Sequence, residues 1–199
     1  TFDVPRERIV VTYEGVDTDL THIKAVKTFV PAKDFYLYVG NCYPHKNIEL
    51  LLRLAQNAKH PFVLVTPDDI FTDRMLVRAQ ALGVEKSISV VRKVDDSVLK
   101  YLYQHARALV FPSFKEGFGL PIVEAAFFSC PLVVSDIPAF REIAPPGTVF
   151  FDPHLYEKAQ KALDTLPTRA HTSYPSSYMA QFSFATMAKQ TLQIYERYL

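Results

Sequence analysis

The sequence has only two cysteines, and their positions exclude several kinds of site. Cys42 and Cys130 stand far apart in the 199-residue chain, and neither belongs to a C-x-x-C pair. A disulfide framework or a cysteine zinc site is therefore not expected, and the reducing cytoplasm is the compartment that fits. The six histidines show neither H-E-x-x-H spacing nor a serine and aspartate partner motif. We expect no dedicated metal site.

Long apolar runs and an excess of one charge are missing too. No stretch approaches the ~20 uncharged apolar residues that a membrane span needs. The formal net charge is +1 and no run of Lys and Arg occurs, so nucleic acid is not an expected partner. The chain begins at Thr1 with neither an initiator methionine nor the apolar core of a signal peptide. We therefore expect it to be cut from a longer protein.

The apolar content that is present suffices for one folded domain. Hydrophobic residues make up 49% of the 199 positions, which is enough to bury a full core. Apolar runs of strand length alternate with segments whose apolar residues have helical spacing. This alternation predicts an α/β fold, in which a Rossmann-like parallel sheet carries helices on both faces.

The pattern places the expected elements along the chain. Buried strands are predicted at 35–40, 62–66, 87–91, 108–111 and 132–135, and a further short strand at 8–17. Helices are predicted after the cap residue Asn47, at 69–82, around Leu99 to Ala106, from Pro121, near 154–165 and at about 183–198. Residues 18–33 are expected to be a connector, and Thr165 to Ser177 form a stretch rich in Pro, Ser and Thr.

The stretch from Pro112 to Glu142 organises the rest of the chain. A strand-like run leads through a loop with Gly117 and Gly119 to a helix whose first position suits Pro121. Both glycines allow positive φ and close approach by a ligand. Because backbone amides at the start of a helix meet the positive end of its dipole, the loop is predicted to cradle a phosphate.

Two carboxylates, Glu116 and Glu124, flank this predicted cradle. A carboxylate repels phosphate, so these side chains are better suited to accept hydrogen bonds from hydroxyls on either side of it. The alternative is that both acids only favour the helix N-terminus, by about 0.3–1 kcal/mol each. The Gly-x-Gly spacing alone favours that alternative.

The complete string is more specific, and it resembles a known family. Glu116-Gly-Phe-Gly-Leu-Pro-Ile-Val-Glu124 resembles the E-x7-E signature of the family-four retaining glycosyltransferases, which have the glycosyltransferase-B (GT-B) fold. Ser135-Asp-Ile-Pro-Ala-Phe-Arg-Glu142 resembles its continuation in mannosyltransferase-like members. The resemblance covers essentially the whole chain but only the second half of a typical member.

This resemblance implies a division of the chain. Residues 1–33 would be the inter-domain connector and entry strand, and residues 34–165 the nucleotide-sugar-binding domain. Residues 166–199 would be a linker and the helix that crosses back to the first domain. An N-terminal acceptor domain or a partner subunit is implied to be missing, and peripheral membrane contact through that missing half is compatible with the resemblance.

Roles for individual residues also follow from the resemblance. Glu116 is implied as the catalytic residue that holds the hydroxyls of the donor sugar, and Glu124 as the acceptor for the ribose diol. The implied donor-binding set is Asn41, Lys46, Val94, Gly117, Phe118, Gly119, Leu120 and Glu124. Within it, Lys46 and the loop amides would hold the diphosphate, and Asn41 stands where the family usually has an arginine. The segment at Val94 would recognise the base, although Arg92 and Lys93 are equally well explained as solvated charges.

Two departures from the family pattern are visible. Thr66-Pro-Asp-Asp69 replaces a glycine-rich turn, and Ser129 replaces the glycine that usually follows the signature helix.

The expected function is therefore donor binding in a retaining glycosyltransferase. Such an enzyme moves a sugar, with mannose suggested by the motif, from a nucleoside diphosphate sugar to an acceptor hydroxyl in glycan or polysaccharide synthesis. No cofactor and no metal are expected. Two alternatives stay open: a non-catalytic nucleotide-sugar-binding or partner subunit, and another GT-B enzyme such as a nucleotide-sugar epimerase, which the E-x7-E context disfavours.

Overall fold

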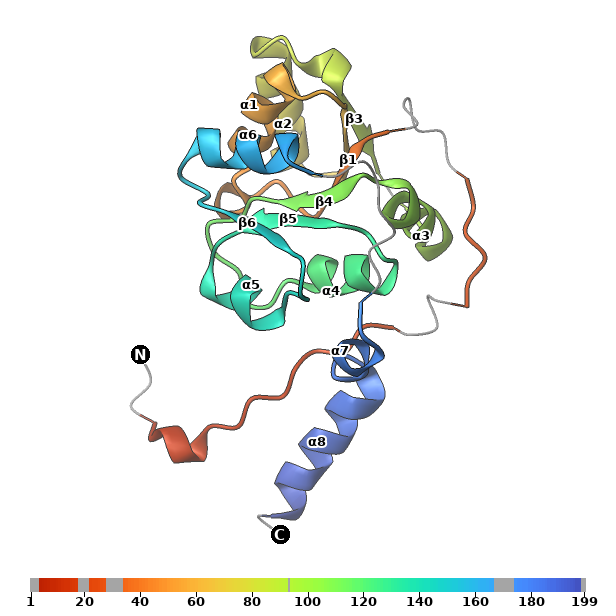
Figure 1. The fold of residues 1–199 in the computed structure, drawn as a ribbon, viewed down its shortest axis with the longest axis vertical. Helices are drawn as coiled ribbons and strands as arrows, with labels where there is room; N and C mark the ends of the chain where they lie inside the picture. Colours follow the sequence, from red (N-terminus) through yellow and green to blue (C-terminus); the bar gives the residue numbers. More distant parts are fainter. Residues whose placement is uncertain (1–3, 18–21, 28–33, 93, 167–173, 198–199) are drawn as a thin grey trace.

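The computed structural model describes residues 4–17, 22–27, 34–92, 94–166 and 174–197. At its centre lies a six-stranded sheet with the order β3-β2-β1-β4-β5-β6, in which all neighbouring strands are parallel (Figure 1). The strands are β1 (Tyr36–Val39), β2 (Phe62–Val65), β3 (Ile88–Val91), β4 (Ala108–Phe111), β5 (Leu132–Ser135) and β6 (Val149–Phe151). The predicted Rossmann-like parallel sheet is confirmed.

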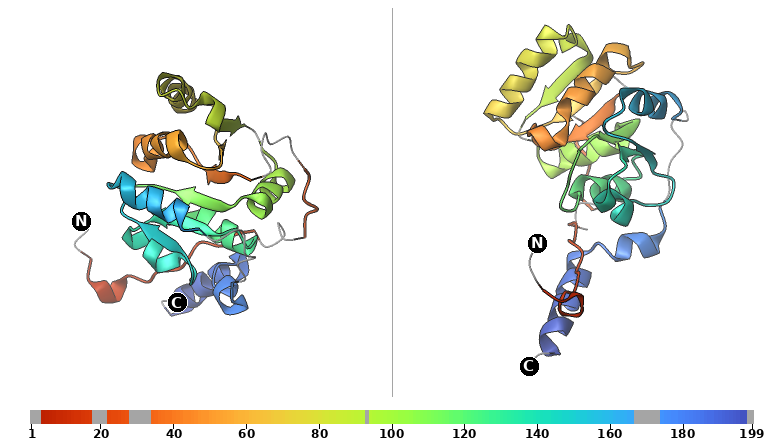
Figure 2. Two further views of the ribbon diagram at one scale, coloured as in Figure 1. Left: turned by 45° about the horizontal axis from the view of Figure 1, so that its top comes forward. Right: turned by 90° about the vertical axis from the view of Figure 1, so that its left-hand side faces the viewer.

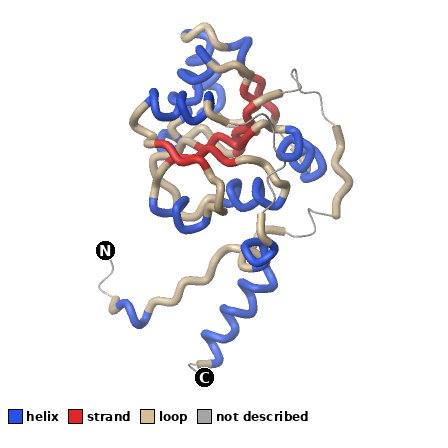
Figure 3. Tube along the Cα trace, viewed as in Figure 1, coloured by secondary structure: helices blue, strands red, loops and turns tan. Residues whose placement is uncertain are grey.

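Helices cover both faces of this sheet. One face carries α1, α2 and α6, and the other carries α3, α4 and α5 (Figures 1 and 3). The helices are α1 (Ile48–Asn57), α2 (Ile70–Ala81), α3 (Asp96–His105), α4 (Leu120–Phe127), α5 (Pro138–Ile143), α6 (Tyr156–Asp164), α7 (Ser176–Ala180) and α8 (Phe184–Glu196). The described residues also contain 3₁₀ turns at Arg6–Arg8, Pro44–Lys46 and Glu85–Ser87.

The core is formed by the strands that have helices on both sides. All residues of β2, β4 and β5 are buried, which explains why their sequences are apolar without alternation, except for Ser135 at the end of β5. The largest fully buried side chains include Tyr38, Phe62, Phe111 and Phe140. These strands give the sheet a rigid carboxyl edge from which loops project.

The strand order creates a crevice between β1 and β4. The chain leaves β1 toward β2 on one side of the sheet and reaches β4 on the other, so the connections after these two strands diverge. In parallel sheets, ligands bind at such a switch point, beyond the carboxyl ends of the strands. The loop after β1 carries Lys46, and the loop after β4 carries Glu116.

The strand predicted at residues 8–17 is wrong. Its extended backbone meets no neighbouring strand over most of its length, because the sheet ends at β3 and β6. Its apolar residues Ile9, Val10 and Val11 are 55%, 49% and 69% exposed. The described residues form only one isolated bridge here, between Val16 and Ser183. The apolar, β-branched residues of the segment favour extended backbone, but a strand also needs a hydrogen-bonding partner.

Besides the 3₁₀ turns, three short elements among the described residues were not predicted. The first two are α5 and β6, which follow the signature helix and complete the parallel sheet. The third is α7, which begins inside the Pro-, Ser- and Thr-rich stretch; residues 167–173 of that stretch lie outside the described residues. Of the predicted connector 18–33, only 22–27 are described, and they contain neither helix nor strand.

The N-terminal segment is attached to the C-terminal part of the chain near Val16 and Phe182. The amide of Val16 donates a hydrogen bond to the carbonyl of Phe182 at 2.7 Å. Gly15 lies so close to Phe184 that a Cβ there would be 2.3 Å from its backbone nitrogen. Beyond this contact, α8 extends away from the sheet (Figure 2), with Leu192 and Tyr195 57% and 63% exposed. Tyr198 lies outside the described residues.

Within the described residues, the longest apolar helices are still too short or too polar to traverse a lipid bilayer.

Candidate functional site

An ion pair crosses the crevice between β1 and β4. The Lys46 ammonium lies 2.7 Å from Oε1 of Glu116, and their side chains are only 13% and 10% exposed. The buried hydroxyl of Ser113 donates a second hydrogen bond to the same Glu116 oxygen at 2.6 Å. The ammonium also lies 5.3 Å from the centre of the Phe111 ring. Both side chains are therefore held in one geometry by fixed neighbours.

Asn47 builds the loop that carries Lys46. Its backbone is left-handed, with φ 55°, and separates the 3₁₀ turn Pro44–Lys46 from α1. The prediction that Asn47 is the cap residue is right in position and wrong in mechanism, because its side chain makes no capping hydrogen bond. Its Nδ2 donates instead to the carbonyls of Pro112 and Pro153, at 3.1 and 3.0 Å. One buried amide thus joins three loops at the carboxyl edge.

Gly119 shapes the start of α4. It is the N-cap residue, with φ +116°, and a Cβ there would lie 2.9 Å from Cε1 of Phe140. Pro121 occupies the second helical position, one residue later than predicted. Gly117 differs from the prediction, because its φ is not positive. A Cβ at Gly117 would meet nothing within 4 Å, so close approach from outside is sterically open there.

A cavity of about 680 Å³ opens above this loop. Its size lies within the range of ordinary small-molecule sites. The predicted site residues that line it are Lys46, Glu116, Gly117, Phe118, Gly119 and Leu120. Val11, Thr12, Tyr13 and Glu14 from the N-terminal segment and Ala139, Glu142 and Ile143 from α5 also contribute. The structure therefore brings most of the predicted site together.

Glu124 lies one turn further along α4 and does not line this cavity. Its Oε2 accepts a hydrogen bond of 2.8 Å from the hydroxyl of Tyr103, which is fully buried in α3. Burial raises the pKa of the Glu124 carboxyl, and the Tyr103 hydrogen bond partly opposes that rise. Burial also holds the pKa of Tyr103 well above its usual range, so the phenol remains a donor.

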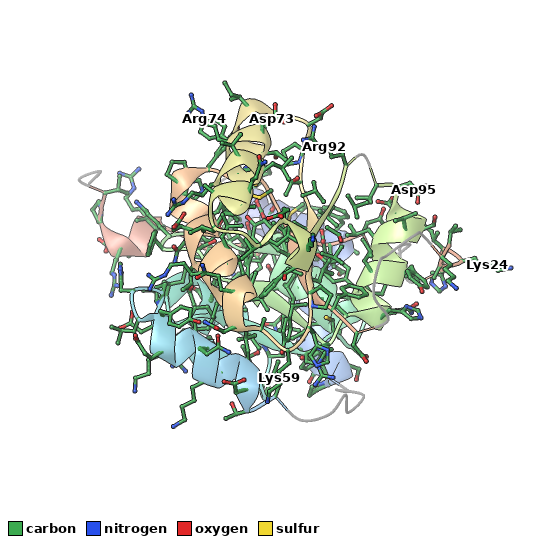
Figure 4. All side chains as sticks on the ribbon, turned by 90° about the horizontal axis from the view of Figure 1, so that it is seen from above. Lys24, Lys59, Asp73, Arg74, Arg92 and Asp95 are labelled. Carbon is green, nitrogen blue, oxygen red and sulfur yellow. The ribbon has the colours of Figure 1, made fainter. Side chains whose placement is uncertain are left out.

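Two other predicted positions, Asn41 and Val94, and the nearby Arg92 are also separate from the cavity. The side-chain oxygen of Asn41 accepts a hydrogen bond from the Tyr43 amide at 3.3 Å, within its own loop. Val94 follows β3 and packs partly against the core. Arg92 forms ion pairs with Asp68 and with Asp73, the latter at 3.0 Å. Arg92 and Asp73 are labelled in Figure 4. These ion pairs favour the structural explanation of Arg92.

Several residues at the site were missed by sequence reasoning. Ser113, Tyr103 and Glu142 carry polar groups that contact or adjoin the predicted residues, and Tyr13 and Glu14 reach the cavity from the N-terminal segment. Glu142 is the last residue of the motif Ser135–Glu142, so the motif could have identified it as a candidate site residue. Nothing in the local sequence pattern places Tyr13 beside α5, because that contact joins residues 129 positions apart.

The chemistry of the cavity follows from these groups. Amides at the start of α4 and the Lys46 ammonium offer positive charge on one side. Glu116 and Glu142 offer hydrogen-bond acceptors for hydroxyl groups. Within the described residues, no cluster of three or more metal-binding side chains occurs.

The chain is similar to several known proteins. A profile of the family described as "Glycosyl transferases group 1" matches residues 21–172. The O-antigen chain mannosyltransferase RfbU of Salmonella typhimurium is 29% identical over 192 residues, covering 94% of this chain and 52% of RfbU. The O-antigen chain mannosyltransferase B of Escherichia coli is 29% identical over 217 residues, covering 98% of this chain and 56% of that protein.

Solved structures show the same fold. A sucrose-phosphate synthase from Thermosynechococcus elongatus superimposes with a TM-score of 0.73 at 22% identity, over 93% of this chain and 49% of its own. The chain spans about half the length of the curated relatives that it matches.

Proposed function

Because the chain belongs to the glycosyl transferases group 1 family, we propose that it is the donor-binding domain of a glycosyltransferase. The complete protein would transfer a hexose from a nucleoside diphosphate sugar to an acceptor hydroxyl in glycan synthesis. The names of two relatives, both O-antigen chain mannosyltransferases, suggest mannose as the sugar. The acceptor would be bound by an N-terminal domain or a partner subunit, and the cytoplasm is the proposed location.

One observation carries this proposal. Lys46 and Glu116 come from the two loops that flank the switch point, and they meet over the Gly117–Gly119 loop at the start of α4. A diphosphate placed there would meet the ammonium and the loop amides together. The sugar attached to it would then lie within reach of the Glu116 carboxylate.

This arrangement suggests how the domain assists transfer. Negative charge builds up on the diphosphate as the bond from the sugar C1 to the phosphate oxygen breaks. Lys46 and the amides of Gly117 to Leu120 would stabilise that charge without reorganising. Glu116 would orient the sugar by accepting hydrogen bonds from its hydroxyls. In retaining transfer by front-face attack, the leaving phosphate takes the proton of the acceptor hydroxyl as the new C1–O bond forms.

The proposal includes independence from metal ions, because Lys46 and the amides supply the positive charge at the diphosphate. Removing divalent cations with a chelator should leave binding of the nucleoside diphosphate unchanged. A loss of binding that Mg²⁺ restores would contradict this part.

The experiment that tests the donor site is a calorimetric titration of the 199-residue chain with UDP, GDP and ADP. Lys46→Ala should weaken binding of the best ligand by about tenfold or more. Lys59→Ala is the matched control, because Lys59 is 71% exposed and its nearest carboxylate oxygen is 3.8 Å away. Absence of binding by the folded wild-type chain, or equal losses in both variants, would overturn the donor-site proposal.

A second candidate function is a non-catalytic subunit that binds the nucleotide sugar. Asn41 favours it, because the side chain is uncharged and is used within its own loop instead of facing the cavity. Transfer activity in the complete protein decides between the two functions. Binding without any transfer to a range of glycan acceptors would favour the second.

A further inference from the structure

A second carboxylate on the wall of the donor cavity has no role in the proposal above. The hydroxyl of Tyr13 donates a hydrogen bond of 3.0 Å to Oε1 of Glu142, and both residues line the cavity that Glu116 also lines. Tyr13 comes from the N-terminal segment and Glu142 from α5. The pair therefore forms only when the chain has folded.

The position of Tyr13 is fixed by its surroundings. Its ring packs against Phe118 of the signature loop and against Phe182, with centres 6.2 and 5.5 Å apart. The residues that follow it are attached to the C-terminal part through the hydrogen bond from Val16 to Phe182. A group that is held in place before a ligand arrives loses little conformational entropy on binding.

Glu142 keeps acceptor capacity that the protein does not use. The neighbouring Arg141 does not neutralise it, because its guanidinium makes two hydrogen bonds to Asp136, at 2.6 and 2.7 Å. That guanidinium also lies 3.9 Å from the centre of the Phe150 ring. Among the described residues, Tyr13 donates the only hydrogen bond to the Glu142 side chain. Oε2 of Glu142 is thus open to a donor from the ligand.

The charge of the cavity indicates which part of a ligand reaches this carboxylate. Three acidic side chains, Glu14, Glu116 and Glu142, line the cavity against the single ammonium of Lys46. A phosphate would be repelled at Glu142 and attracted at Lys46. An ionised carboxylate only accepts hydrogen bonds, so the group that suits Glu142 is an uncharged hydroxyl. The Glu142 hydrogen bond raises the pKa of Tyr13, so the phenol stays protonated and remains a donor.

We propose that Glu142, positioned by Tyr13, accepts a hydrogen bond from a hydroxyl of the sugar carried by the nucleoside diphosphate. Glu116 and Glu142 then accept hydrogen bonds from different hydroxyls of one sugar. The pair Tyr13–Glu142 thereby contributes to the specificity for the donor sugar. This inference rests on the proposed function, because it needs the diphosphate to be anchored at Lys46 and the signature loop.

The test separates binding of the sugar from binding of the nucleotide. The 199-residue chain is titrated with UDP and UDP-glucose and with GDP and GDP-mannose, and the affinity ratio of conjugate to free nucleotide is measured. Glu142→Ala should lower this ratio by about tenfold or more while leaving affinity for the free nucleotide nearly unchanged. Glu142→Gln, which keeps an acceptor oxygen, should restore part of the ratio.

Further variants isolate the role of Tyr13. Tyr13→Phe keeps the ring contacts and removes the hydroxyl, so it should lower the ratio by about two- to tenfold. An unchanged ratio would overturn the positioning role of Tyr13. Glu157→Ala is the matched control, because Glu157 is exposed on α6 and is not among the residues that line the cavity. It should leave the ratio as it is in the wild type.

The outcomes distinguish failure of the proposed donor-binding function from failure of the proposed role of Glu142. A wild-type chain that binds none of the four compounds would overturn the proposed function and this inference with it. A wild-type chain that binds nucleotide and conjugate, with the same ratio in Glu142→Ala, would overturn the inference alone. Equal weakening of nucleotide and conjugate in Glu142→Ala would also overturn it, because a purely structural role predicts that result.

Discussion

The hydroxyl of Tyr103 on α3 donates a hydrogen bond to Oε2 of Glu124 on α4 at 2.8 Å. The phenol is completely buried and its ring stacks on Phe128, 5.7 Å away between centres. Tyr103 therefore engages one carboxylate oxygen of Glu124, and among the described residues no hydrogen bond to its other oxygen is found. If a ribose diol binds Glu124, as the family resemblance implies, then the protonation of Glu124 controls binding.

The first prediction concerns the pH dependence of nucleotide binding. Burial raises the pKa of Glu124, and only the ionised form accepts two hydroxyl hydrogen bonds. Affinity for the nucleoside diphosphate should fall as pH is lowered through that raised pKa. Tyr103→Phe removes the bond that opposes the rise, so the fall should move to higher pH. Titrations at a series of pH values from neutral downward measure both curves, and coincident curves would refute the link.

The second prediction applies the same ionisation to stability. Since the pKa of Glu124 is raised in the folded state, the folded protein holds this proton more tightly than the unfolded chain does. Its contribution to stability is present below the ordinary carboxyl pKa and is lost as pH rises through the raised value. The unfolding free energy of the wild type relative to Glu124→Gln should therefore decrease with rising pH. Denaturant titration of both proteins at several pH values checks the sign of this slope.

The third prediction compares the two glycines of the signature loop. Gly119→Ala should destabilise the fold by about 1–3 kcal/mol, because of the positive φ and the contact with Phe140. Gly117→Ala should change stability by less than about 0.5 kcal/mol, since its Cβ would meet open space. It should still weaken binding of the nucleoside diphosphate, because the methyl group would stand where a phosphate approaches the amides. Thermal unfolding measures the stability of both variants, and calorimetry measures their affinity for the nucleoside diphosphate.

The fourth prediction concerns the amide of Asn47. Asn47→Ala leaves the carbonyls of Pro112 and Pro153 without their donor and keeps the unfavourable φ, which should cost about 2–4 kcal/mol. Asn47→Gly removes the same hydrogen bonds but accepts the φ, so it should cost less than Asn47→Ala. Chemical denaturation measures the unfolding free energy of both variants. Equal losses would show that the left-handed φ at position 47 does not cost the alanine variant any stability.

The fifth prediction is a stabilising substitution at the end of α4. Ser129 has φ 56°, and the amides of Ser129 and Cys130 donate to the carbonyls of Ala126 and Ala125, at 3.0 and 2.8 Å. These bonds form the helix-ending arrangement that normally carries glycine at this position. Ser129→Gly should stabilise the fold by about 1 kcal/mol, because glycine adopts positive φ without strain. A lower melting temperature in Ser129→Gly would contradict this account.

The parallel sheet and the signature loop could be predicted because both depend on short-range patterns. Runs such as 62–65 and 132–134 are apolar throughout and short, which indicates strands covered on both faces. The loop from Glu116 to Pro121 combines glycines, a helix start and acids at fixed spacing. These signals are local, so they can be read without knowing the rest of the fold.

Contacts between segments that are distant in the sequence could not be predicted from it. The β propensity of 8–17 suggested a strand, but whether a partner strand lies beside it depends on the whole topology. The Lys46–Glu116 pair and the Tyr13–Glu142 pair each join two segments that are far apart in the sequence and that only the fold brings together. The role of Asn47 was missed for the same reason, because its partners Pro112 and Pro153 are remote in sequence.

The absence of space between Gly15 and Phe184 limits how this chain can diverge. Any side chain at position 15 forces the backbone at Ser183 and Phe184 to move, because a Cβ would lie within 2.6 Å of three backbone atoms there. Substitutions at position 15 are therefore expected to be inherited together with changes in the segment that leads into α8. Covariation between these two places, among descendants of a common ancestor, would record this contact in sequences alone.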